Sequence, residues 1–268
     1  MDPDRYLERV GVDPASVTVG AVDLDTVARL QHAHVGAVPF ENLAIVGDPF
    51  DDADDGADVV LELPHLFEKV VERERGGYCF ELNGLFGWLL DELGVATDRV
   101  AARVVGDDGT GRPPANHHTN VVEFDRRYLV DVGIGTPTMR RPLPVDGEVV
   151  TGPVGVDWRV VESDRPDETH LTQYRTPGDD DWQDRYLFTD EPRDLSYFEA
   201  TCDYLQSAPE SPFTGDPIVT IATATGHAKL KRDTFVREEG GEEYEQAVDP
   251  DAWHDVLARE FGLRYRSG

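Results

Sequence analysis

Cys79 is one of two cysteines in the chain, and it stands where a thiol could act as a nucleophile. In the stretch RGGYCFELN, residues 75–83, it follows two glycines and precedes an apolar run at helical spacing. Because the glycines break the chain, we expect a helix to begin near Cys79. Unpaired N–H groups at a helix N-terminus lower the pKa of a thiol and favour the thiolate. The alternative interpretation is a buried structural cysteine.

A pair of histidines and an aspartate could supply the base that such a thiol needs. Two strands joined by a short turn carry NHHTN, residues 116–120, and Asp131. Folding this hairpin brings the histidines close to Asp131, because antiparallel partners lie about 5 Å apart. A carboxylate beside an imidazole fixes its tautomer and stabilises its charged form, which is the arrangement of covalent catalysis. The alternative interpretation is a solvated hairpin with an aspartate that caps its turn.

Only one of the two histidines can face Asp131, and the length of the turn decides which. Neighbouring residues of a strand point to opposite faces of the sheet. A two-residue turn pairs Asn120 with Asp131 and favours His118, whereas a three-residue turn favours His117. The residues of the hairpin alone do not decide whether His117 or His118 faces Asp131.

The elements that position these side chains follow from the period of the apolar residues. Up to residue 94 apolar residues recur at helical spacing, and from residue 98 they alternate, as in a small antiparallel barrel or sandwich. After residue 192 helical and strand signals are mixed. Helices are expected at 2–10, 23–36, 62–72, 79–94, 195–204 and 249–261, and strands at 100–105, 119–124, 128–132, 156–161, 171–175, 185–187, 218–224 and 228–231.

We therefore predict an α+β fold with three domains. Residues 1–94 form a helical domain that carries the nucleophile, residues 95–191 form an antiparallel β-barrel domain that carries the histidine and the aspartate, and residues 192–268 form an α/β lid. The length of 268 residues suffices for such a set of cores.

The composition is strongly acidic, with 54 Asp and Glu against 25 Lys and Arg and a formal charge of −29. This charge argues against nucleic acid or an anionic membrane as a partner. Molar salt shortens the screening length to about 3 Å, and at that length dense surface carboxylates are tolerated. The acidic composition therefore predicts a halophilic, archaeal-type protein. No export signal and no apolar run of about 20 residues is present, so we expect a cytoplasmic protein with reduced thiols. We expect no metal site.

Four blocks of the sequence resemble the arylamine N-acetyltransferase family. RGGYCFELN resembles the signature RGGxCxExN, and PFENL at 39–43 resembles the family's upstream block. DVGIG at 131–135 is similar to DVGFG, with Ile134 in place of the usual aromatic residue, and SAPESPF at 207–213 is similar to SxxPxSxF. Val122 and Glu123 resemble the strand residues that precede the turn in the family. Counting back from them aligns His117 with the family's histidine, so we prefer His117 to His118.

The resemblance implies a fold and a reaction. The fold is a helical domain, a β-barrel and an α/β lid around a Cys-His-Asp core like that of transglutaminases and papain. The reaction is ping-pong transfer of an acetyl group from acetyl coenzyme A, through a thioester on the cysteine, to an arylamine, arylhydrazine or arylhydroxylamine. The enzyme would be a monomer or weak oligomer without a metal.

The resemblance also implies roles for single residues. It predicts a buried ion pair between Arg75 and Glu41. Its other assignments are a catalytic triad of Cys79, His117 (or His118) and Asp131, a coenzyme A site at Gly133, Gly135 and Thr136, and a pocket for the aryl group at Phe40, Tyr78 and Phe213.

Three other functions fit part of this pattern. A hydrolase of the papain or transglutaminase type uses the same triad and would cleave amides without coenzyme A. An amide synthase of the same family would close a macrolactam from a carrier-bound acyl chain. A binding protein that keeps the fold without catalysis is the third, and the intact set of thiol, imidazole and carboxylate argues against it.

Overall fold

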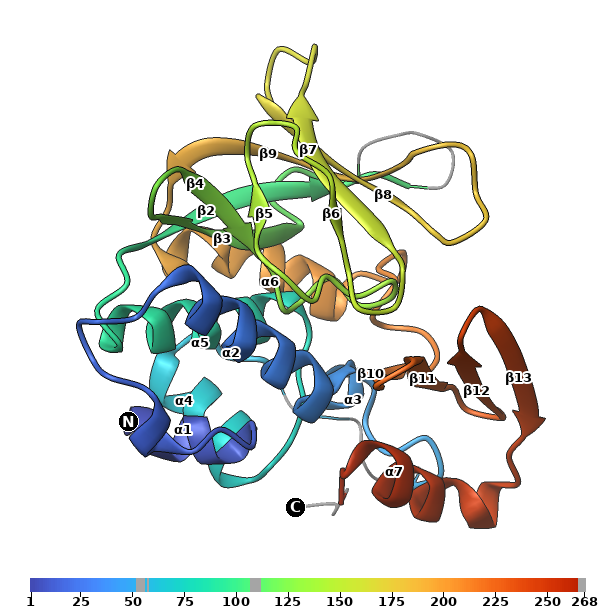
Figure 1. Ribbon diagram of the computed structural model, residues 1–268. Coiled ribbons are helices and arrows are strands. Elements are labelled where there is room, and N and C mark those ends of the chain that lie inside the picture. The colour runs from blue at the N-terminus through green and yellow to red at the C-terminus, as the bar shows by residue number, and fades with distance from the viewer. Residues whose placement is uncertain (52–55, 57, 107–111, 265–268) are drawn as a thin grey trace.

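A computed structural model describes residues 1–51, 56, 58–106 and 112–264 (Figure 1). Helices from the first third of the chain lie below an eight-stranded sheet, and the last quarter adds a five-stranded sheet with a helix (Figure 1). This is the predicted α+β fold. Within the described residues, no helix has the length and apolar character needed to cross a membrane.

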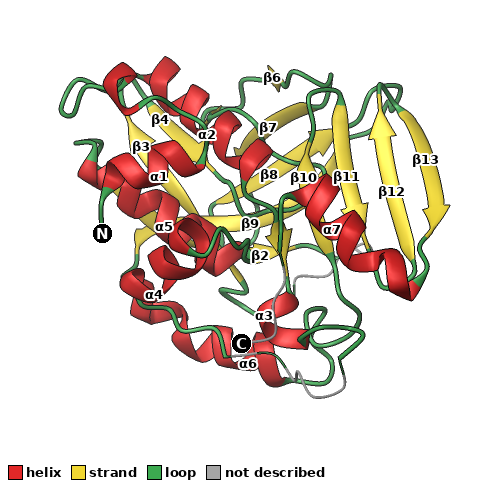
Figure 2. Ribbon diagram, turned by 90° about the horizontal axis from the view of Figure 1, so that it is seen from below, coloured by secondary structure: helices red, strands yellow, loops and turns green. Residues whose placement is uncertain are grey.

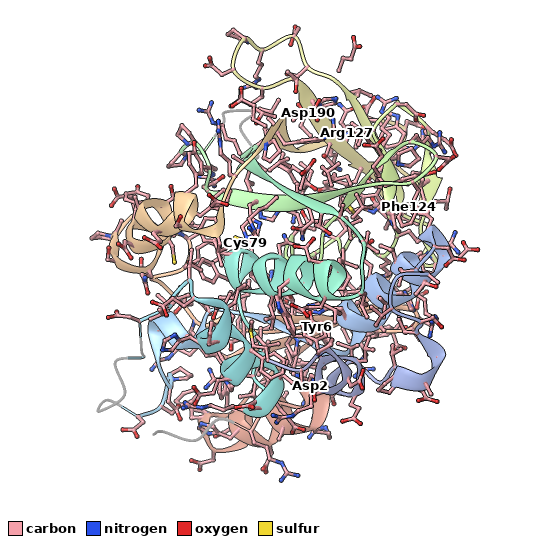
Figure 3. All side chains as sticks on the ribbon, turned by 90° about the vertical axis from the view of Figure 1, so that its left-hand side faces the viewer. Asp2, Tyr6, Cys79, Phe124, Arg127 and Asp190 are labelled. Atoms are coloured by element: carbon pink, nitrogen blue, oxygen red, sulfur yellow. The ribbon has the colours of Figure 1, made fainter. Side chains whose placement is uncertain are left out.

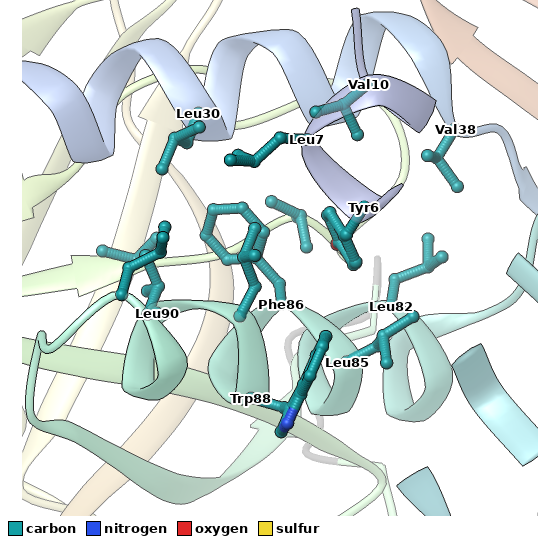
Figure 4. Close-up of a cluster of buried hydrophobic side chains, with 14 of the residues drawn as sticks. Tyr6, Leu7, Val10, Leu30, Val38, Leu82, Leu85, Phe86, Trp88 and Leu90 are labelled. Carbon is teal, nitrogen blue, oxygen red and sulfur yellow. The ribbon is translucent and has the colours of Figure 1, made fainter. Parts of the chain in front are cut away.

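The N-terminal helices surround α5, which begins at the cysteine of the predicted site. Aspartate side chains cap α1 and α2, where Asp2 accepts from the N–H of Asp4 and Asp23 from that of Thr26. Figure 4 shows apolar side chains of α1 and α2 packed against those of α5. The helical elements are α1 (Pro3–Arg9), η1 (Pro14–Ser16), α2 (Leu24–Ala37), α3 (Leu43–Val46), α4 (Leu63–Phe67), the π-helical turn η2 (Glu68–Glu72) and α5 (Cys79–Glu92).

The eight-stranded antiparallel sheet curls into a nearly closed barrel, because β5 near one edge contacts β7 near the other. Its interior is apolar and includes Trp158, Phe188 and Met139. The strand order is β5-β4-β3-β2-β9-β8-β7-β6. The strands are β2 (Thr97–Val104), β3 (His117–Glu123), β4 (Arg127–Val130), β5 (Leu143–Pro144), β6 (Val150–Thr151), β7 (Asp157–Glu162), β8 (His170–Arg175) and β9 (Gln183–Pro192).

The C-terminal part forms a second sheet, and α7 lies across it (Figure 2). Its first strand, β1 (Phe40–Glu41), comes from the N-terminal part and pairs with β10. The division into domains at residues 94 and 191 stays a prediction. The other elements are η3 (Leu195–Phe198), α6 (Glu199–Ser207), β10 (Val219–Ala222), β11 (Gly226–Leu230), β12 (Thr234–Glu239), β13 (Glu242–Ala247), η4 (Pro250–Ala252) and α7 (Trp253–Phe261).

Candidate active site

Cys79 is the first residue of α5, and a tight turn places it there (Figure 3). Glycine is required in this turn, because a Cβ on Gly76 would lie 2.2 Å from the carbonyl oxygen of Pro39. The carboxylate of Glu81 accepts from the N–H of Tyr78 at 3.1 Å and so satisfies one of the free donors of the first turn.

A cluster of buried charges lies under this turn and fixes it to the neighbouring segments. The predicted pair is confirmed, since Arg75 Nη2 lies 3.3 Å from Glu41 Oε1. A second ion pair joins Lys69 Nζ to Glu81 Oε1 at 2.7 Å. This pair was not predicted from the sequence. Although burial opposes it, the charges of Lys69 and Arg75 hold the pKa of Glu41 below its usual value. The turn before Cys79 is therefore held by ion pairs that are largely shielded from water.

The structure places His117, rather than His118, against Asp131. Glu123 pairs with Arg127, so the turn between β3 and β4 has three residues. His117 Nε2 lies 2.7 Å from Asp131 Oδ2, and both side chains are buried. Burial alone would raise the pKa of Asp131, but His117 and the donors on its carboxylate hold that pKa below its usual value. Asp131 is thus a carboxylate that can orient His117 and stabilise it when charged.

His118 points to the opposite face of β3 and has another environment. Its Nε2 lies 3.1 Å from the carbonyl oxygen of Phe80, and its ring stacks on the Phe80 ring. Burial, with the nearby charge of Arg99, lowers the pKa of His118 well below its usual value. His118 therefore stays neutral and packs in the core between α5 and the barrel.

The thiol of Cys79 is buried, and its surroundings correct one expectation. Burial raises the pKa of Cys79 well above its usual value, and the carboxylate of Asp131 acts in the same direction. The lowered pKa expected from the helix N-terminus is wrong for the thiol alone, because that expectation left out desolvation. Cys79 keeps its proton unless a base removes it, and His117 lines the same cavity.

This cavity has a volume of about 430 Å³, and Cys79 is one of the residues that line it. Phe40 and Phe213 line it, with ring centroids 6.2 Å apart, and their role in a pocket for the aryl group stays a prediction. Tyr78 does not line it but lies fully buried behind Phe213, and its hydroxyl meets Cys202 Sγ at 2.8 Å. The mostly apolar lining suits a planar aromatic molecule.

The predicted glycine segment after β4 has two different parts. Gly133 lines the cavity, and a Cβ there would lie 2.8 Å from Cys79 Cα, so close packing accounts for this glycine. Gly135 adopts a φ of 71° and Thr136 follows it, both outside the set of described residues that line the cavity. Arg185 donates to the carbonyl oxygen of Thr136 at 3.2 Å and to that of Ile134 at 2.5 Å.

Two arginines and an asparagine of the site were not predicted. Arg112 and Arg185 line the cavity, yet neither lies in a block with a recognisable pattern. Asn83 donates to Asp131 Oδ1 at 2.9 Å, and its position four residues after Cys79 in RGGYCFELN was the signal that could have found it. Among the described residues, no group of three His, Cys, Asp or Glu side chains could hold a metal ion.

Comparison with known proteins agrees with this geometry. Residues 23–267 match the N-acetyltransferase family. The chain belongs to this family. An arylamine N-acetyltransferase of Mycolicibacterium smegmatis is 33% identical over 98% of this chain and 92% of its own length.

Two further family members are informative. Proansamycin X synthase of Amycolatopsis mediterranei is 30% identical over 96% of both chains. The structure of Mycobacterium marinum arylamine N-acetyltransferase in complex with CoA superimposes with a TM-score of 0.84 at 29% identity, covering 98% of this chain and 93% of the other. The protein is therefore an enzyme that transfers acyl groups, with the fold of the arylamine N-acetyltransferases.

Proposed function

We propose that this enzyme transfers an acetyl group from acetyl coenzyme A to an arylamine, arylhydrazine or arylhydroxylamine. Cys79 is the nucleophile, His117 the base and Asp131 the residue that orients the base. The observation that carries this proposal is the 2.7 Å contact of His117 Nε2 with Asp131 Oδ2, beside Cys79 in a largely apolar cavity. The likeness to arylamine N-acetyltransferases, one of them in complex with CoA, supports the donor and the acceptor class.

In the first half-reaction Cys79 takes the acetyl group. His117 removes the proton from the thiol, and because Asp131 holds Nε2, Nδ1 is the ring nitrogen that accepts it. The thiolate attacks the thioester carbonyl, and the sulfur of coenzyme A leaves with a proton from His117. One thioester replaces another, so the step is nearly balanced in free energy. Backbone N–H groups at the start of α5 are the donors that we propose for the oxyanion.

In the second half-reaction the amine attacks the acetyl-enzyme. Its nitrogen forms an amide bond while the bond to Cys79 Sγ breaks, and His117 accepts a proton from the nitrogen and returns one to the sulfur. Phe40 and Phe213 flank the cavity and can hold the aryl ring near Cys79. Gly133, Gly135 and Thr136 form the segment proposed to contact coenzyme A, and the place of Gly133 in the lining of the cavity supports this assignment.

The test is mass spectrometry of the protein mixed with acetyl coenzyme A in molar KCl. We expect the mass of one acetyl group on the wild type, removed when an arylamine is added. Cys79→Ala should carry none, whereas Cys202→Ala, which changes the other cysteine, should be acetylated like the wild type. If no short acyl coenzyme A gives an adduct, acetyl transfer is excluded and a thiol hydrolase or a carrier-bound substrate takes its place.

An amide synthase is the second candidate, because proansamycin X synthase is 30% identical over nearly the whole chain. Such an enzyme would transfer an acyl chain from a carrier to an amine of the same molecule. Turnover of simple acetyl coenzyme A with free arylamines separates the two, since a synthase would form the acyl-enzyme only from the larger donor.

The formal charge of −29 supports a proposal about the salt concentration in which the enzyme works. We propose a cytoplasmic enzyme of a halophile, monomeric or weakly oligomeric, in which dense surface carboxylates are tolerated because salt screens them. Circular dichroism in graded KCl tests this assignment, with loss of structure at low salt expected.

A further inference from the structure

Asn83 connects the helix of the nucleophile to the two strands of the other catalytic residues. It lies one turn after Cys79 on α5 and is fully buried. Its Nδ2 donates to Asp131 Oδ1 at 2.9 Å and to the carbonyl oxygen of His118 at 2.7 Å. Its Oδ1 accepts from the N–H of Val132 at 2.8 Å. Every polar atom of this side chain thus binds the strand region that holds the base and its partner.

The carboxylate of Asp131 receives a donor on each oxygen. His117 meets Oδ2, while Asn83 and the N–H of Gly133, at 2.8 Å, both bind Oδ1. Donors of this kind stabilise the ionised form and fix the plane of the carboxylate. Asn83 donates to Oδ1 from its side chain, whereas Gly133 donates from the main chain.

The side-chain amide of Asn83 is packed against the loop after β4. A Cβ on Gly133 would lie 2.9 Å from Asn83 Nδ2, so the loop after β4 packs directly on the amide. The main-chain carbonyl oxygen of Asn83 accepts from Asn120 Nδ2 at 3.0 Å, which ties this turn of α5 to β3. The position of the side-chain amide is therefore determined by its own hydrogen bonds and by the packing of the loop after β4.

Several titratable groups face Asp131 from the surrounding elements. Cys79 lies on α5, His117 and His118 on β3, and Tyr186 on β9. A change in the charge of Asp131 acts first on His117, which is in direct contact with it, and through His117 on the proton of Cys79.

We propose that Asn83 is a positioning residue, which keeps the Asp131 carboxylate ionised and turned toward His117 and so sets the pH range in which Cys79 becomes a thiolate. The proposal rests on the proposed function in the assignment of His117 as the base. Without the Asn83 donor the carboxylate stabilises charged His117 less well, so the thiolate forms only at higher pH.

The test is the rate of alkylation of Cys79 by iodoacetamide between pH 5 and 9. All proteins carry Cys202→Ala, which leaves Cys79 as the sole thiol, and all are measured in molar KCl. Asn83→Ala should move the midpoint of the rate profile upward by roughly one to two pH units, the equivalent of one hydrogen bond to a charged group. The kcat for acetyl transfer at neutral pH should fall about tenfold or more, with KM for acetyl coenzyme A little changed.

Asn120→Ala is the matched control. It removes one buried hydrogen bond in the same layer but no contact to Asp131, so its alkylation profile should be that of the parent. If Asn83→Ala does not fold, Asn83→Ser replaces it, since a serine hydroxyl is too short to reach Asp131 and the same shift is expected. In an Asp131→Asn background the substitution of Asn83 should shift the profile no further.

This experiment distinguishes a failure of the positioning role of Asn83 from a failure of the proposed function. Equal profiles for the parent and for Asn83→Ala would overturn the positioning role, whatever the enzyme acetylates. A shifted profile in a protein that takes no acetyl group from acetyl coenzyme A would support the role of Asn83 and overturn the proposed function instead.

Discussion

Two adjacent histidines on β3 show how strongly the face of a strand decides chemistry. His117 meets a carboxylate at 2.7 Å, while His118 meets a carbonyl oxygen and an aromatic ring. A carboxylate stabilises the charged imidazole, whereas a buried carbonyl next to an aromatic ring gives no comparable compensation for desolvation. Only His117 is therefore equipped to receive and release a proton.

Substitution of each histidine by glutamine distinguishes their roles. His117→Gln should slow the acetylation of Cys79 by roughly 10²–10⁴, the usual effect of losing a general base. His118→Gln should keep most of the rate but lower the stability, because it disturbs the packing against Phe80. Single-turnover acetylation measured by mass spectrometry and unfolding in urea provide the two readouts. The opposite order of rates would make His118 the base.

The choice between these histidines separates what could be predicted from the sequence from what required the structure. Cys79 and Asp131 could be singled out because RGGYCFELN and DVGIG resemble blocks of the arylamine N-acetyltransferase family, which match these two residues without ambiguity. The histidine depended on one residue of turn length, and the pairing of Glu123 with Arg127 decides it. Asn83 was missed although it stands in the block RGGYCFELN, because its partners lie 35 and 48 residues away and the block alone does not show them.

At the scale of elements, the helices of the N-terminal part followed from the helical spacing of their apolar residues. The hairpin of β12 and β13 was not predicted, because β13 is exposed along its whole length and carries glutamates where a strand usually alternates. The expected strand 185–187 is part of a longer one, Gln183–Pro192, whose ends are polar because they extend beyond the barrel core. A strand can be predicted from a sequence when one of its faces is buried, because apolar and polar residues then alternate.

The packing of α2 on α1 and α5 includes a buried histidine, which makes the helical part sensitive to acid. His34 Nδ1 lies 2.7 Å from the hydroxyl of Tyr6, and its ring meets Phe86 edge to face. Burial, with the charge of Arg9, lowers the pKa of His34 from 6.5 to about 3. Between these values the unfolded chain binds a proton that the folded chain does not, so stability falls as pH falls through this window.

The expected size of this effect at pH 5 is about 2 kcal/mol less stability than at pH 8 from His34 alone. His34→Gln keeps a polar partner for Tyr6 but does not titrate. Urea unfolding of both proteins at pH 8 and pH 5, in the same molar KCl, measures the difference. The variant should lose about 2 kcal/mol less than the wild type between the two pH values. An identical loss would show that His34 does not control the acid response.

At the scale of the whole molecule, the net charge and the local charges of the site act on coenzyme A in opposite directions. The charge of −29 repels a polyanion, most strongly at low salt, where the screening length is about 30 Å at 0.01 M. The guanidinium groups of Arg112 and Arg185 lie at the cavity and attract it at short range. Arg140, which follows the glycine segment, is buried and donates to the carbonyl oxygen of Thr223.

Salt should therefore improve the binding of the donor. Molar KCl shortens the screening length to about 3 Å, which removes the long-range repulsion while the contacts at the cavity persist in part. We expect KM for acetyl coenzyme A to fall as KCl rises from low to molar concentration. The neutral donor p-nitrophenyl acetate provides the control, since its KM should depend little on salt, and circular dichroism checks that the protein is folded at each concentration. A KM for acetyl coenzyme A that rises steadily with salt would mean that Arg112 and Arg185 outweigh the net charge, because only short-range attraction is weakened in that direction.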